Sequence, residues 1–74
     1  MIGRLVSGAA GEVRIRVCGA SIERFLNVAL QGEIGLWNTV RVDARTIETT
    51  LSLSDFYALR RLMGRTGCRV RVIG

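Results

Sequence analysis

The side chains able to do covalent chemistry are few, and their types argue against catalysis. The chain has no His, so the commonest general base near neutral pH is missing. The candidate nucleophiles have no evident activating partner in the sequence. They are Ser21, Ser54, Cys18 and Cys68. Two cysteines without His also leave a zinc ligand set incomplete. We therefore expect no enzymatic activity, no metal and no cofactor.

Charge is the second kind of chemistry that the sequence offers. All 11 basic residues are Arg, and the formal net charge of the 74 residues is +5. Such a balance favours anionic partners, whether nucleic acid, an acidic protein surface or phospholipid headgroups. No apolar run approaches the roughly 18 to 20 residues of a membrane span, and no signal peptide opens the chain. The chain as given is expected to be soluble, with reduced thiols.

The hydrophobic periods predict the elements that position these side chains. Residues 11–18 alternate as a half-buried strand, and the period becomes helical for residues 21–31. Ser21 is the expected N-cap, and Gly32 the expected left-handed residue at the C-terminus. Strands follow at residues 36–43 and 47–53, then a helix at 54–66 capped by Ser54 and ended by Gly67, and a strand at 69–73. Residues 1–10 form a lead-in without a clear period.

This order predicts an α+β fold, a ferredoxin-like βαββαβ sandwich formed by one domain of residues 11–74. Its four-stranded antiparallel sheet has the strand order 4-1-3-2, with both helices on one face. The cysteines end the first strand and begin the last, which are neighbours, but they point to opposite faces. Free, buried or shielded thiols are therefore expected rather than a disulfide. The residues expected to face the helices are Val13, Ile15, Val17, Leu36, Val40, Val42, Ile47, Thr49, Leu51, Leu53, Val70 and Val72; Ile22, Phe25, Leu26, Ala29 and Leu30 form the first helix's apolar stripe.

The opposite face of the sheet is the candidate partner-binding surface, because arginines from the first and last strands meet there. A simply solvated face is the ordinary alternative. The central strands carry no outward aromatic residue, so recognition of nucleic acid by base stacking is disfavoured. The candidate partner-binding residues are Arg14, Arg16, Trp37, Arg41, Arg69 and Arg71.

Several segments, taken together at their spacing, resemble the amino-terminal domain of the YqfD family of stage IV sporulation proteins. They read GEVRIRVCG at residues 11–19, IERFLN at 22–27, LWN at 36–38, SDF at 54–56 and TGCRVRVI at 66–73. The resemblance implies a longer parent chain with a membrane-spanning helix after this domain. It also implies a role in endospore formation in a Gram-positive bacterium, on the cytoplasmic side of the mother cell's membrane. It implies no catalytic residue.

From the residues and the resemblance we expect a non-enzymatic protein-interaction domain of a membrane-anchored sporulation protein. The alternative is a module that binds nucleic acid or anionic lipid through the basic sheet face. Association with the membrane would come from a segment of the parent chain beyond Gly74. Self-association through the edges of the second and fourth strands is also an expectation.

Overall fold

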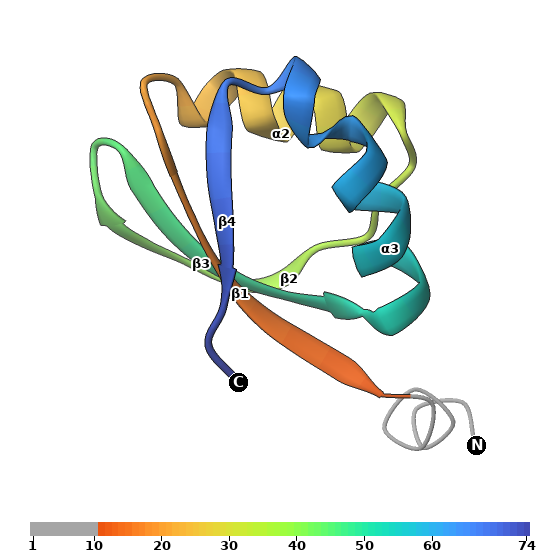
Figure 1. The fold of residues 1–74 in the computed structure, drawn as a ribbon. Helices are drawn as coiled ribbons and strands as arrows, with labels where there is room; N and C mark the ends of the chain where they lie inside the picture. Colours follow the sequence, from red (N-terminus) through yellow and green to blue (C-terminus); the bar gives the residue numbers. More distant parts are fainter. Residues whose placement is uncertain (1–10) are drawn as a thin grey trace.

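The structure, a computed structural model, describes residues 11–74, and the predicted lead-in lies outside the described residues. Strands and helices follow one another in the predicted order (Figure 1). They are β1 (Glu12–Gly19), α2 (Ile22–Gln31), β2 (Trp37–Asp43), β3 (Thr46–Ser52), α3 (Leu53–Leu62), the 3-10 turn η1 (Met63–Arg65) and β4 (Cys68–Val72).

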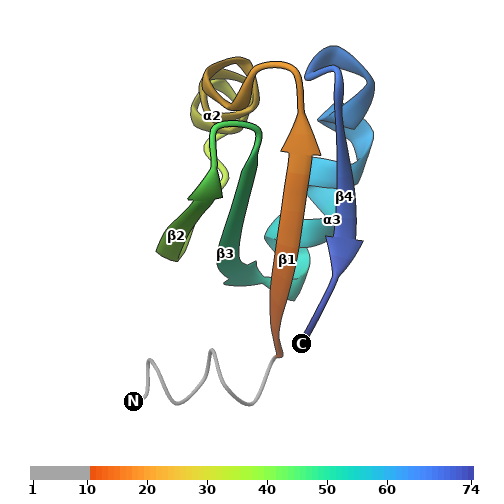
Figure 2. The ribbon, with the colours of Figure 1, turned by 90° about the vertical axis from the view of Figure 1, so that its left-hand side faces the viewer.

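The four strands form one antiparallel sheet in the order β2-β3-β1-β4, which confirms the predicted neighbours. In the view of Figure 2, α3 lies behind β1 and β4, and α2 is seen end-on above β2 and β3. Buried side chains of both helices join those of the sheet in one core. The core fills the space between the sheet and the helices. Its most deeply buried hydrophobic side chains are Ile15, Val17, Ile22, Phe25, Ala29, Ile47, Leu51 and Leu59.

Helix α2 begins as predicted, but its end differs. The Ser21 hydroxyl accepts a hydrogen bond from the Arg24 amide at 3.1 Å, as an N-cap does. Gly32 has φ −84° and is not left-handed; Glu33 takes that conformation instead, with φ 59°. Gly32 lets the end of α2 lie close to the Leu62 side chain of α3, since an added Cβ would lie 2.6 Å from Leu62 Cδ1. The predicted stripe also fails at Leu30, which is 76% exposed.

Helix α3 begins two residues earlier than predicted, because its N-cap is Ser52 and not Ser54. The Ser52 hydroxyl accepts from the Asp55 amide at 3.1 Å, and the predicted cap, Ser54, lies 3.3 Å from Ser52 Oγ. Ser52 can cap because its backbone is extended, and Leu53 therefore opens the helix instead of pointing inward from β3. The α-helix ends at Leu62, earlier than the predicted end at residue 66, and η1 follows it. Gly67 is left-handed as predicted, with φ 69°, and comes after η1.

Candidate partner-binding face

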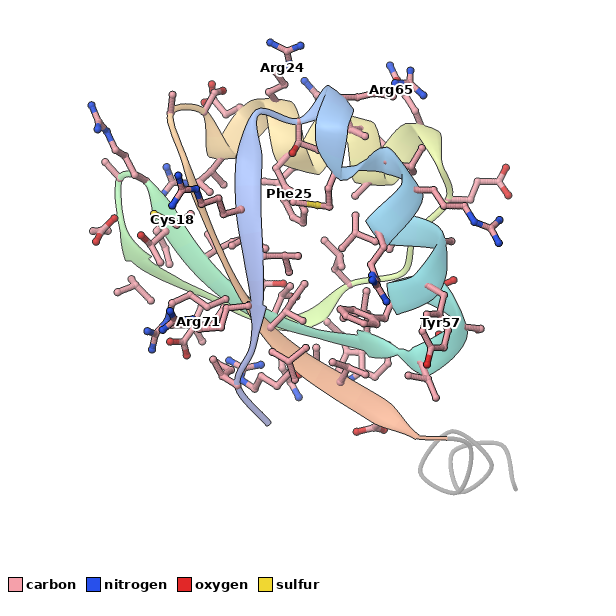
Figure 3. The ribbon with its side chains drawn as sticks, in the orientation of Figure 1. Cys18, Arg24, Phe25, Tyr57, Arg65 and Arg71 are labelled. Carbon is pink, nitrogen blue, oxygen red and sulfur yellow. The ribbon has the colours of Figure 1, made fainter. Side chains whose placement is uncertain are left out.

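The side of the sheet away from both helices, here called the open face, gathers charged residues from three strands. Arg16 of β1 lies opposite Glu48 of β3 on one side and Arg71 of β4 on the other. Directly opposed residues of antiparallel strands point to the same face. Figure 3 shows Arg71 and Cys18 on this side of the sheet, and Phe25 between the sheet and α2.

Arg16 is neutralised within the domain. Its Nη2 and Nε donate to the same oxygen of Glu48, Oε2, at 2.8 and 3.0 Å. Both side chains keep contact with solvent, so we expect the ion pair to contribute no more than about 1 kcal/mol to folding. The charge of Arg16 is therefore balanced before any partner arrives.

Arg14 has an internal structural role on the open face. Its Nη1 donates to the Asn38 carbonyl at 2.9 Å and to Thr50 Oγ1 at 2.8 Å. Asn38 has φ 52°, a conformation that non-glycine residues adopt infrequently. Arg14 thus reaches from β1 across β3 and helps to hold an irregular turn of the β2 backbone.

That irregularity in β2 changes which side chains face outward. The register shifts between Trp37, opposite Thr50, and Val40, opposite Glu48, as at a β-bulge. Trp37 shares the open face with Thr50 and is partly exposed, as predicted. An extra residue in one strand reverses the alternation beyond it. The predicted orientation is therefore wrong for residues 39–41, up to the second register shift between Arg41 and Asp43.

Two side chains of β2 show the reversal. Thr39, predicted to point outward, has its hydroxyl 2.7 Å from that of Thr49, which is fully buried on the helix side. Val40, predicted to point inward, lies opposite Glu48 and is 53% exposed. Val42, also predicted to be inward, lies within the second register shift and is 52% exposed.

Arg41 is the one candidate binding residue that the register removes from the open face. It lies opposite Ile47, a core residue of the helix side, and its Nη2 donates to the Ala44 carbonyl at 3.2 Å. The predicted grouping of Arg41 with the other five candidates is therefore wrong. The cause is the same bulge, which the residue pattern alone signals only by the polar Asn38.

In the part of the chain that the structure describes, the two arginines of β4 have no partner on the open face. Within residues 11–74, neither guanidinium group makes a hydrogen bond or an ion pair, and Arg71 lies directly opposite Arg16. A shallow pocket of about 380 Å³ opens beside them. Its lining residues are Arg16, Cys18, Arg69, Val70 and Arg71. The sequence predicts the cluster, but only the cross-strand register reveals which arginines are balanced.

The two thiols are free, as predicted, but Cys18 is not shielded. Cys18 is exposed on the open face, where its sulfur accepts from Thr46 Oγ1 at 3.5 Å. Cys68 is half-buried, and its Sγ donates to the Ser21 carbonyl at 3.5 Å. Cys18 and Cys68 point to opposite faces of the sheet, which explains why they do not form a disulfide.

The described part of the chain has neither a metal-binding cluster nor a membrane-spanning helix. Residues 11–74 contain no group of three His, Cys, Asp or Glu side chains placed to hold a metal ion. In the same range, no helix combines the length and apolar character needed to cross a membrane. The absence of a cofactor and of enzymatic activity stay predictions.

Comparison with protein families decides the relationship suggested by the sequence. The family described as "Putative stage IV sporulation protein YqfD" matches residues 8–74. The chain belongs to the YqfD family. The match includes every strand and helix of the sheet-and-helix sandwich, and the family name connects this YqfD domain with sporulation. Comparison with curated proteins and with solved structures gave no match.

Proposed function

We propose that this YqfD domain is a non-enzymatic protein-interaction domain of a membrane-anchored protein required for endospore formation, on the cytoplasmic side of the mother cell's membrane. The observation that carries the proposal is the composition of the open face. Trp37 and Val40 are solvent-accessible at its β2 edge, and the uncompensated Arg69 and Arg71 lie at its β4 edge. Trp and Arg are enriched among the residues that dominate binding energy at protein interfaces.

The charge distribution favours a protein partner over nucleic acid. Arg16 is matched by Glu48, and Arg14 is engaged with the β2 backbone, so the centre of the face is not a continuous basic track. The outward residues of β1 and β3 include no aromatic ring on which a base could stack. A protein surface that combines acidic and apolar groups would complement both edges.

Site-specific photo-crosslinking in sporulating cells tests the proposal. A photoreactive amino acid would replace Trp37 or Val72 of the full-length parent protein, one position at each edge strand. Leu30, which is exposed on α2, provides the matched control position. We expect one or more identified proteins to be captured from the sheet positions and not from Leu30. Capture of no protein from either sheet position would contradict the proposal.

The competing proposal is a module that binds nucleic acid or anionic lipid, and the free guanidinium groups of Arg69 and Arg71 are the observation in its favour. Such binding depends on charge and weakens steeply as salt rises. Binding of the chain to RNA or to phosphatidylserine vesicles at physiological salt, lost in the variant Arg69→Glu with Arg71→Glu, would support this alternative. We expect no such binding.

A further inference from the structure

We infer that the outer edge of β4 accepts an extended strand of a partner protein in which acidic side chains alternate with apolar ones. The inference rests on the proposed interaction function and specifies the chemistry of the partner. It is carried by the backbone of β4, by the regularity of this edge and by the two kinds of side chain that the edge presents.

The backbone groups of β4 divide between the two sides of the strand. Ile73 donates its amide to the Arg14 carbonyl of β1 at 2.8 Å. Because alternate residues of an antiparallel strand direct their amide and carbonyl to opposite sides, those of Arg71 face β1 and those of Val70 and Val72 face outward. In residues 11–74, β4 pairs with no strand other than β1. Val70 and Val72 therefore offer two donors and two acceptors to an additional strand.

The regularity of β4 sets it apart from β2, the other edge strand. The pairing of β4 with β1 runs without a register shift from Cys68 to Val72. The pairing of β2 with β3 shifts twice, between Trp37 and Val40 and again between Arg41 and Asp43. Bulges of this kind hinder strand addition, whereas a regular edge supports it. In the described sheet, an additional strand therefore pairs more readily with β4 than with β2.

The side chains of β4 specify what kind of strand fits. Arg69 and Arg71 lie on the open face, and Val70 and Val72 lie on the helix side, where Val72 is 54% exposed. An added strand would place alternate side chains beside each set. Acidic residues would lie beside the arginines, with the open pocket next to Cys18 available to a carboxylate, and apolar residues would cover the valines.

A second copy of this chain is a poor occupant of the same edge. In a two-fold antiparallel pairing of β4 with β4, residues of the open face would lie beside residues of the open face. Arg69 and Arg71 of one chain would then lie against those of the other, and like charges in such positions oppose pairing. Charge complementarity thus favours a different, acidic strand.

A synthetic peptide in which Glu alternates with Val tests the inference on the whole chain by isothermal titration calorimetry. We expect saturable binding and a loss of affinity of about tenfold or more in the variant Arg69→Glu with Arg71→Glu. The matched control is Arg61→Glu with Arg65→Glu, which changes the net charge equally at exposed positions of α3 and η1. It should retain the affinity of the unmodified chain.

Further arms separate strand addition from simple charge attraction. A peptide of the same composition with the Glu residues in one block should bind more weakly, and one that alternates Lys with Val should not bind. Val72→Pro removes one outward amide without a change in charge and should also weaken binding. Equal losses in both charge variants, equal binding of the blocked peptide or full affinity in Val72→Pro would overturn the inference. Circular dichroism of each variant verifies that it is folded.

Three further results would distinguish failure of the inference from failure of the proposed function. Cellular capture from Trp37 but not from Val72 would overturn strand addition at β4 and leave a protein-interaction function in place. Sedimentation showing a dimer that the variant Val72→Pro disrupts would assign the edge to a second copy, which also overturns the inference. Peptide binding without any cellular partner would support the edge chemistry and contradict the proposed function.

Discussion

The two halves of the domain, β1-α2-β2 and β3-α3-β4, have the same order of elements but differ in how much of the core they supply and in the regularity of their edge strands. In the first half, α2 buries Ile22, Phe25, Val28 and Ala29, whereas in the second half α3 buries Leu59 alone among its described residues. The first half ends in β2, which is bulged and exposed throughout, and the second half ends in the regular strand β4. The first half thus supplies more of the core, and the second supplies the edge suited to a partner.

The largest expected effect is a difference in folding stability between core substitutions in α2 and in α3. Phe25→Ala should destabilise the domain by about 3 to 5 kcal/mol, because Phe25 is fully buried and its removal leaves a cavity. Phe56→Ala should cost clearly less, because Phe56 is only partly buried at the margin of the core. Urea unfolding of both variants measures the difference. Equal losses would contradict the asymmetry between α2 and α3.

Gly19, between β1 and α2, and Gly67, before β4, should resist substitution for different physical reasons. A Cβ on Gly19 would lie 2.8 Å from the Cys68 Cα, so Gly19→Ala forces backbone apart and should cost about 1 to 3 kcal/mol. Gly67→Ala meets no atom but retains φ 69°, which should cost about 1 to 2 kcal/mol.

Gly64→Ala is the matched control for these two variants. It has no neighbour within 4 Å and no positive φ, so its unfolding midpoint should be close to that of the unmodified chain. A loss at position 64 as large as that at position 19 would show that the close approach of Gly19 to Cys68 is not what matters.

The helix caps provide a smaller effect. Ser21→Ala and Ser52→Ala should each cost about 1 kcal/mol, because each removes an acceptor from an amide of the first turn. Ser54→Ala should stay within about 0.5 kcal/mol, as an exposed substitution away from a cap. Thermal unfolding can rank the three variants. A greater loss at Ser54 than at Ser52 would restore the start of α3 that the sequence favours.

The smallest effect concerns the open face itself. Arg16→Ala should destabilise the domain by up to about 1 kcal/mol because it removes the ion pair with Glu48. Arg71→Ala should be neutral or stabilise by a few tenths of a kcal/mol, since its charge faces Arg16 without a partner. Unfolding at low and high salt compares the two. A destabilising Arg71→Ala would show that Arg71 is not reserved for a partner.

The sequence predicts the second half's final strand better than the first half's, for a physical reason. Strict alternation in residues 69–73 continues without interruption, and β4 begins one residue before the prediction. In β2 the predicted range is one residue too long at its start, and the predicted faces are wrong for residues 39–41, because the register shifts after Trp37, where Asn38 is left-handed. The polar Asn38 within an apolar parity was the only local signal of it.

Apart from Arg41, the members of the candidate site could be predicted from the sequence, but their pairing could not. Alternation places Arg14, Arg16, Arg69 and Arg71 on one face, and the structure agrees. Which of them remains uncompensated depends on the register of β1 against β3, which sets Arg16 beside Glu48. That register is a relation between distant segments, and no local pattern contains it.

Amide hydrogen exchange, followed by nuclear magnetic resonance with and without the alternating Glu and Val peptide, tests most directly whether β4 is the partner edge. The amides of Val70 and Val72 should exchange rapidly in the chain alone and become protected when the peptide is bound, with the β2 amides unchanged. Protection of β2 instead, or amides of Val70 and Val72 that are already protected in the chain alone, would contradict a free β4 edge that receives the partner strand.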